Sequence, residues 1–150
     1  KLQRTTDVDI RPARAGDFEV AKKLLQTAGL PVEDLSAAHA GNFLVASIGG
    51  ATVGFIGLEP FRDIGLLRSL VVDPGARDAG LGRLLVTELE AQARRRGITE
   101  LWLLTIDANG YFSKLGYRVQ ERHTAPENIR QTDEFSTLCP GDAVLMKKTI

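Results

Sequence analysis

The most informative stretch of this sequence is VVDPGARDAGLGR, residues 71–83. Its β-branched start predicts a strand that stops at the turn residues 73–75, and the apolar periodicity that follows predicts a helix beginning at Leu81. The first turn of such a helix points free N–H groups outward, and the positive end of the helix dipole adds to them. Gly80 and Gly82 allow a ligand to approach the backbone closely. The stretch therefore predicts an anion cradle suited to a phosphate ester.

Two better-known phosphate motifs do not fit this stretch. Gly75 and Gly80 have the spacing of a P-loop, but leucine and glycine follow where that motif needs Lys and Ser or Thr. Gly80 and Gly82 could open a dinucleotide fingerprint, but Leu85 occupies the position of its third glycine. The pattern that remains is Arg-x-x-Gly-x-Gly, over residues 77–82.

The composition fits a single domain with its own core. A chain of 150 residues with 43% hydrophobic content buries about 70% of the surface that it exposes when unfolded, so neither a metal nor a disulfide is needed to hold it. Nineteen basic and nineteen acidic residues leave no net charge, which argues against a nucleic-acid partner. The single cysteine, Cys139, cannot form an internal disulfide, and no apolar segment reaches membrane length. We therefore expect a cytoplasmic protein without a membrane partner.

Periodicity and turn residues predict the other elements. Strands are expected at residues 8–12, 43–48, 52–58, 66–72, 101–105, 117–121 and 143–148. Helices are expected from an Asp17 cap to residue 28, then at residues 32–38, 81–96 and 108–115. The nearly continuous apolar run over residues 66–72 indicates a strand that is buried on both faces. The basic residues 94–96 are expected to lie in solvent at a helix C-terminus.

The Arg-x-x-Gly-x-Gly pattern between a strand and a helix resembles the coenzyme A pyrophosphate loop of the GNAT superfamily of N-acetyltransferases. The predicted order β-α-α-β-β-β-α-β-α-β-β is also that of the family, and the resemblance is most specific over residues 66–117. It implies one α/β (α+β) domain over residues 1–150, with a mixed, mostly antiparallel sheet that splays at its middle strands and with helices on both faces. It also implies acetyl-CoA as co-substrate, bound where strands 66–72 and 101–105 separate.

The same resemblance assigns the cofactor-binding residues. Backbone groups of the first middle strand would pair with the pantetheine arm, and the loop and first helical turn would hold the pyrophosphate. These residues are Leu70, Val71, Val72, Arg77, Asp78, Ala79, Gly80, Leu81, Gly82 and Arg83. Thr105, Asn109 and Phe112 complete the set. Core packing of the Leu70 and Val72 side chains is compatible with this role, because the main chain makes the contacts.

The sequence departs from the family pattern at the catalytic acid. Family members commonly carry a tyrosine four residues before the glycine that ends the helix after the second middle strand, and Phe112 stands there. Tyr111 lies about 100° around the helix and is the remaining candidate for protonating the thiolate, which with a pKa near 8.5 can also leave unassisted. The asparagine often found seven residues earlier is replaced by Thr105. Asn109 is out of register and is expected to cap the short helix.

The acceptor amine must lose a proton before it attacks, because an alkylammonium with a pKa of about 10 is mostly protonated at neutral pH. Many relatives carry a glutamate in the strand that here has Arg68 and Ser69. Glu59 is the first candidate for the base or water organiser, and a solvated charge at a strand end is the alternative. Asp107 ranks second, with a loop or cap role as its alternative. His123 has a suitable unperturbed pKa, but a lone histidine after a strand is more often structural or exposed.

Arg68 lies in an apolar strand, where a cation costs desolvation energy unless it meets an anion. Arg68 and Ser69 are therefore candidate contacts for an anionic group of the substrate. An ion pair of Arg68 with Glu59 or Asp63 is the alternative, and the sequence leaves both open.

A narrower resemblance points to the arsenic-resistance N-acetyltransferase group. It rests on residues 66–70, on residues 105–117 with Phe112 at the usual tyrosine position, and on the tail over residues 129–140. It implies a small amine acceptor, either an amino acid or an amino-acid-like organoarsenical. A single thiol makes a poor metalloid site and direct transfer needs no covalent stage, so Cys139 is interpreted as a small buried apolar residue.

Two other functions stay open at this stage. Phe112 and the missing strand carboxylate suggest a catalytically silent acyl-CoA-binding sensor, and the fold would also serve a protein N-acetyltransferase. Residues 126–140 are long enough to cover the acceptor side, which places the protein acceptor lower. Homodimerisation through the C-terminal strands is a possibility that the resemblance raises.

Overall fold

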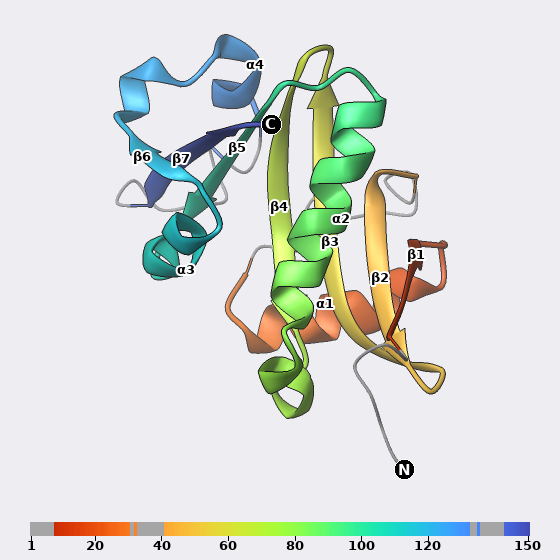
Figure 1. Ribbon diagram of the computed structural model, residues 1–150. Coiled ribbons are helices and arrows are strands. Elements are labelled where there is room, and N and C mark those ends of the chain that lie inside the picture. Colours follow the sequence, from red (N-terminus) through yellow and green to blue (C-terminus); the bar gives the residue numbers. More distant parts are fainter. Residues whose placement is uncertain (1–7, 31, 33–40, 133–134, 136–142) are drawn as a thin grey trace. The chain divides into compact units, whose positions relative to one another are not determined.

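The computed structural model describes residues 8–30, 32, 41–132, 135 and 143–150, and for residues 77–79 the backbone alone. The strands of this described part are β1 (Val8–Pro12), β2 (Phe43–Ile48), β3 (Ala51–Phe61), β4 (Ile64–Val72), β5 (Glu100–Thr105), β6 (Arg118–Gln120) and β7 (Val144–Thr149). The α-helices are α1 (Asp17–Thr27), α2 (Leu81–Arg95), α3 (Asn109–Lys114) and α4 (Glu127–Arg130), and short 3-10 helices are η3 (Pro74–Ala79) and η4 (Arg122–Thr124) (Figure 1).

The strands hydrogen-bond in the order β1-β2-β3-β4-β5-β7-β6. β2 pairs antiparallel with β1 and β3, and β7 pairs antiparallel with β5 and β6. β4 and β5 are parallel, with residues 64–66 opposite residues 100–102. The predicted α/β fold with a mixed, mostly antiparallel sheet is therefore confirmed. The splay of its middle strands stays a prediction.

The chain divides into two compact units. The first is made from residues 1–57 and 69–89, and the second from residues 58–68 and 90–150. β3, β4 and α2 each contribute residues to both. A single domain over residues 1–150 stays a prediction, and each unit is described by itself below.

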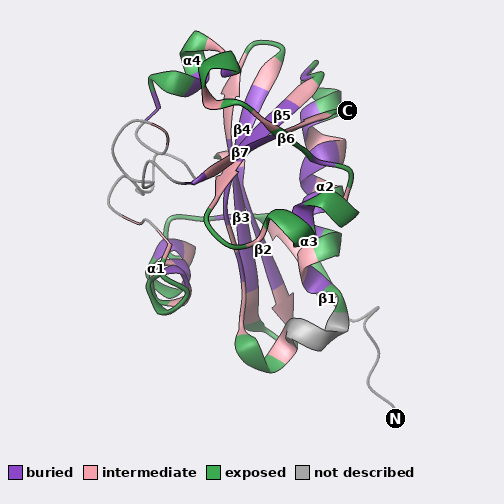
Figure 2. Cartoon of the chain, turned by 90° about the vertical axis from the view of Figure 1, so that its left-hand side faces the viewer, coloured by how far each residue is buried: buried purple, intermediate pink, exposed green. Residues whose placement is uncertain are grey.

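The first unit buries both faces of its strands. Successive side chains of a strand point to opposite faces. The face toward α1 holds a buried cluster of Phe18, Ala21, Leu25, Phe43, Val45, Phe55 and Val71. The opposite face meets α2 at Gly54, where an added Cβ would lie 2.9 Å from Leu85 Cδ1. α1 and α2 accordingly lie on opposite sides of these strands (Figure 1, Figure 2).

The second unit is built around β5 and β7. Its buried cluster on one face of these strands consists of Leu66, Trp102, Ala125, Ile129 and Leu145. Ile129 belongs to α4, so α4 covers that face. The opposite face carries Leu101 and Lys148, which are paired across the two strands, and Lys148 reaches Glu90 of α2. This unit is therefore covered on both faces as well.

Most predicted elements are confirmed, with shifts at their ends. β3 continues past the predicted end at Leu58 as far as Phe61, which places Glu59 inside the strand. α4 was not predicted, because a four-residue helix shows no periodicity. Residues 33–38 of the helix predicted over residues 32–38, and Cys139, lie outside the described residues. Within the described ranges, no helix is long and apolar enough to span a membrane.

The sequence predicted Asp17 as the N-cap of α1, and this prediction is wrong. Gly16 holds that position, and Asp17 is the first helical residue. Its Oδ2 accepts a hydrogen bond from the Arg14 N–H at 2.7 Å and from Arg11 Nη1 at 2.8 Å. The hydrogen bond from Arg11 holds the pKa of the Asp17 carboxyl below its usual value. The carboxylate therefore fastens the turn before the helix rather than capping the helix.

Candidate active site

The predicted phosphate cradle is a 3-10 turn that leads directly into α2. Asp73 begins it: its Oδ1 accepts from the Gly75 N–H at 2.9 Å, and its own N–H donates to the Val53 carbonyl at 2.7 Å. Gly80 follows η3 with φ 73° and ψ 22°, a left-handed conformation that glycine adopts without steric cost. The Gly80 carbonyl accepts from the Leu84 N–H at 3.2 Å. The loop is thus tied to the sheet at one end and to the helix at the other.

The N-terminus of α2 is suited to an anion. Its first turn holds no acidic residue, and the N–H groups of residues 81–83 come before the first N–H that an α-helix can satisfy internally. Leu81 is buried, Gly82 is half-buried and Arg83 is exposed. No described atom lies within 4 Å of a Cβ placed on Gly80. The contacts of Arg77, Asp78 and Ala79 with a cofactor stay predictions.

β4 changes its backbone geometry at Ser69. Its φ of 61° lies in the left-handed region, which residues other than glycine rarely adopt. Beyond it, Leu70 and Val72 are half-buried, whereas Val71 is buried in the cluster beside α1. Core packing is therefore the observed role of the Val71 side chain. Backbone pairing of Leu70 and Val72 with a pantetheine arm stays a prediction.

Glu59 and Arg68 form an ion pair in the second unit. Arg68 Nη1 donates to Glu59 Oε2 at 2.8 Å, and the exposed fractions of the two side chains are 1% for Arg68 and 22% for Glu59. Asp63, the other partner considered for Arg68, is exposed, and its backbone carbonyl accepts from the Thr99 N–H. The charge of Arg68 is thus balanced within the protein. An anionic substrate is not needed to explain an arginine in this strand.

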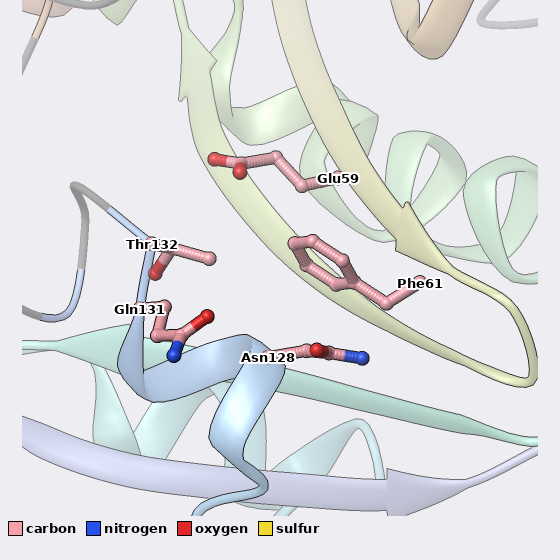
Figure 3. Close-up of a pocket in the computed structure, with 5 residues that line it drawn as sticks. All are labelled: Glu59, Phe61, Asn128, Gln131 and Thr132. Atoms are coloured by element: carbon pink, nitrogen blue, oxygen red, sulfur yellow. The ribbon is translucent and has the colours of Figure 1, made fainter.

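Glu59 also lines a pocket of about 330 Å³. Phe61 stands beside it on β3, and Asn128, Gln131 and Thr132 approach from α4 and the two residues that follow it (Figure 3). Within the described part of the chain, Oε2 of Glu59 is held by Arg68, and Oε1 makes no hydrogen bond. The pocket therefore presents one oriented carboxylate with an oxygen available to a ligand. Sequence reasoning found Glu59 but missed the α4 side of the pocket, because the helix there gave no signal.

The two aromatic residues of α3 differ in their burial. Phe112 is buried and lies edge-on between the rings of Tyr111 and Tyr117, at centroid distances of 5.4 and 5.8 Å. Tyr111 is 41% exposed. Thr105 Oγ1 accepts from the N–H of residue 108 at 3.0 Å, and residue 108 rather than Asn109 is the N-cap of the helix. The expected capping role of Asn109 is therefore wrong.

Asp107 and His123, the other candidates for the base, are not among the described residues that line this pocket. Asp107 is exposed. The His123 side chain is 77% exposed, and its Nε2 lies 3.5 Å from Glu121 Oε1. These exposed positions agree with the alternative interpretations of Asp107 as a loop or cap residue and of His123 as an exposed residue.

A buried polar cluster that the sequence did not reveal joins α2 to β7. The Tyr117 hydroxyl donates to Glu90 Oε2 at 2.9 Å, and Lys148 Nζ lies 3.1 and 3.0 Å from the two Glu90 oxygens. Burial, together with the Glu90 charge, raises the pKa of Tyr117. The partners are far apart in the sequence, so no local pattern could have indicated the cluster. The cluster holds the C-terminal end of α3 and the last turns of α2 in place within the second unit.

Comparisons with known proteins agree with this arrangement. The model of the acetyltransferase (GNAT) family matches residues 10–117. An N-acetyltransferase of Chlorobaculum tepidum is 32% identical over 117 residues, which are 75% of this chain and 73% of that protein. An amino-acid acetyltransferase of Shewanella oneidensis is 32% identical over 91 residues, 59% of this chain but 20% of that longer protein. N-acetylglutamate synthase from Neisseria gonorrhoeae, solved with coenzyme A and L-arginine, superposes with a TM-score of 0.82 at 24% identity, covering 95% of this chain and 33% of that one.

Proposed function

This chain belongs to the acetyltransferase (GNAT) family, and we propose that it transfers the acetyl group of acetyl-CoA to the amine of a small molecule of amino-acid size. N-acetyl transfer is the reaction class of the family. The acceptor and the residues that handle it are the new part of the proposal. Its main support is the Glu59 carboxylate, held by Arg68 at 2.8 Å in a pocket of about 330 Å³.

Glu59 suits the handling of an amine. An ammonium group seeks a carboxylate, and Glu59 Oε1 has no hydrogen bond within the described residues. A carboxylate beside the amine can also take its proton, directly or through one water. The amine nitrogen then attacks the thioester carbonyl carbon, the C–S bond breaks, and coenzyme A leaves as a thiolate that takes up a proton. Arg68 keeps the Glu59 carboxylate oriented during these steps.

The cofactor is assigned to the first unit. Backbone N–H groups of Gly80, Leu81, Gly82 and Arg83 would bind the pyrophosphate, because the loop and the start of α2 offer donors and no acidic side chain in the first turn. On β4, Arg68 and Ser69 directly precede Leu70 in the sequence, so one strand carries both the residue that orients Glu59 and the backbone proposed for pantetheine. Tyr111 is the proposed proton donor to the thiolate, since Phe112 has no acidic group.

The small acceptor is favoured by two observations. The pocket is of a size for an amino acid, and an amino-acid acetyltransferase is among the relatives. The likeness to the arsenic-resistance group adds an amino-acid-like organoarsenical to the acceptors that should be tried.

The test is amine-dependent release of coenzyme A thiol from acetyl-CoA. The panel contains acidic, neutral and basic amino acids, an organoarsenical amino acid, polyamines and a lysine peptide. Release with one or more small amines supports the proposal. Release with the lysine peptide alone would contradict it in favour of a protein acceptor, and acetyl-CoA binding without release from any amine would contradict it in favour of a sensor.

A further inference from the structure

The pocket beside Glu59 has two walls of different chemistry. Glu59 and Phe61 are two residues apart on β3, so their side chains leave the same face of the strand. Asn128 and Gln131 are three residues apart on and just after α4, so they share one face of that turn. Figure 3 shows the two pairs facing each other across the pocket.

The charges of the pocket limit what it can hold. Of the lining residues that the structure describes, Glu59 alone is charged, and Arg68 balances it. One ammonium group can share the carboxylate. Among these described lining residues, a second ammonium at the far end of the ligand would find no further carboxylate, and a carboxylate at that end would find no cation.

The α4 wall offers uncharged hydrogen-bonding groups instead. Gln131 Nε2 donates to Glu127 Oε2 at 3.0 Å, which fixes the carboxamide and leaves its oxygen on the pocket side (Figure 3). Asn128 is exposed, and its carboxamide makes no hydrogen bond within the described part of the chain. Its N–H₂ and its oxygen are therefore both available to a ligand.

Thr132 adds an apolar surface rather than a polar one. Its Oγ1 donates to the Ile129 carbonyl at 2.7 Å and accepts from the Phe135 N–H at 3.2 Å. The hydroxyl is thus engaged with the backbone, and the methyl group lies toward the pocket (Figure 3). Together with the Phe61 ring it forms a surface for the aliphatic stem of an acceptor.

We infer that this pocket selects amines whose far end is uncharged and hydrogen-bonding, such as a carboxamide or a hydroxyl group, and that Asn128 and Gln131 are its specificity-determining residues. The inference rests on the proposed function, because it takes Glu59 as the place of the reacting amine. A carboxamide has both a donor and an acceptor, which match the Gln131 oxygen and the Asn128 amide. A site built for such hydrogen bonds discriminates strongly against analogues that lack them.

The first experiment compares four amino acids of similar size but different far ends: glutamine, glutamate, ornithine and norleucine. The measured quantity is kcat/KM for coenzyme A release. We expect glutamine to exceed each of the others by at least about tenfold, because even the weaker discriminations that a binding pocket achieves are of that order. A preference for glutamate or for ornithine would overturn the inference while leaving the proposed function intact.

The second experiment changes the charge of the α4 wall. Asn128→Asp should raise the kcat/KM ratio of ornithine to glutamate by about tenfold, and Asn128→Lys should lower it by about the same factor. Asn128 is exposed and makes no hydrogen bond to the described chain, so both variants should fold. Gln26→Glu and Gln26→Lys, at an exposed position of α1, are the controls and should leave the ratio unchanged.

The outcomes separate the two proposals. An unchanged ratio in both Asn128 variants would overturn the role of Asn128. If the unmodified protein released no thiol with any of the amines, the proposed function would fail, and the inference that rests on it would fail with it.

Discussion

Substitutions of Glu59 and Arg68, which form an ion pair, should interact strongly in their effects on stability, and the two single substitutions should destabilise the protein by different amounts. Glu59→Gln removes the carboxylate that balances a guanidinium of 1% exposure, and we expect a loss of about 3 kcal/mol in the free energy of unfolding, at the lower end of the range for breaking a buried pair. Arg68→Met leaves Glu59, whose side chain is 22% exposed and keeps part of its hydration, so a loss of about 1–2 kcal/mol is expected.

The assay is urea unfolding of the two single variants and of the double variant. The double variant should lose less than the sum of the single losses by about 1.5–2 kcal/mol, because the second substitution removes a member of an ion pair that the first has already broken. The matched control is the cycle of Glu100→Gln and Lys147→Met, since those side chains are 3.9 Å apart and 34% and 30% exposed. Its coupling should stay below about 0.5 kcal/mol. A Glu59–Arg68 coupling as small as that of the control, or a larger loss for Arg68→Met than for Glu59→Gln, would show that Glu59 does not compensate the charge of a buried Arg68.

Three further predictions concern other parts of the molecule. Asp17→Asn should lower the free energy of unfolding by about 1 kcal/mol at neutral pH. This difference should shrink once the pH falls below the ordinary aspartate pKa and vanish as the pH passes through the lower pKa that Asp17 has in the folded state. Urea unfolding across pH measures it, and an equal loss at every pH would contradict the carboxylate's role. Tyr117→Phe should lower the free energy of unfolding by about 1.5–3 kcal/mol, since it removes a hydrogen bond to the buried Glu90 carboxylate. Thermal unfolding measures this, with Tyr111→Phe as the control at an exposed tyrosine. Equal stability of the two variants would contradict the prediction. In steady-state assays Tyr111→Phe should lower kcat about tenfold, a modest effect for a general acid because the thiolate leaves readily, whereas an unchanged kcat would remove Tyr111 from the mechanism.

The sequence predicted the fold well because its signals are local. Gly49-Gly50 marks the turn between β2 and β3, the apolar run before Asp73 marks β4, and the periodicity after Gly80 marks α2. α4 escaped because a single helical turn has no periodicity, although its residues complete the pocket. Cytoplasmic location and homodimerisation stay predictions.

The candidate site was only partly predictable for a different reason. The glycine loop is a continuous motif, so it could be found from spacing alone. The pairing of Glu59 with Arg68 depends on two strands lying side by side, and the sequence left Asp63 as an alternative partner. The cluster of Glu90, Tyr117 and Lys148 joins three distant segments, and only the folded structure brings them together.

We propose that the loop at Gly80 binds acetyl-CoA, whose acetyl group is transferred to a small amine. The most direct measurement quantifies free coenzyme A and N-acetylated amine in the same reaction, for the unmodified protein, Gly80→Asp and Gly97→Asp. Both glycines have positive φ, 73° and 84°, with no described atom within 4 Å of an added Cβ, so the two variants carry similar backbone strain, and Gly97 is remote in sequence from the loop. We expect equal amounts of the two products from the unmodified protein. Gly80→Asp should lower kcat/KM for acetyl-CoA at least about tenfold, because the new charge repels phosphate, and Gly97→Asp should change it little. Equal activity of the two variants, or thiol release without acetylated amine, would contradict it.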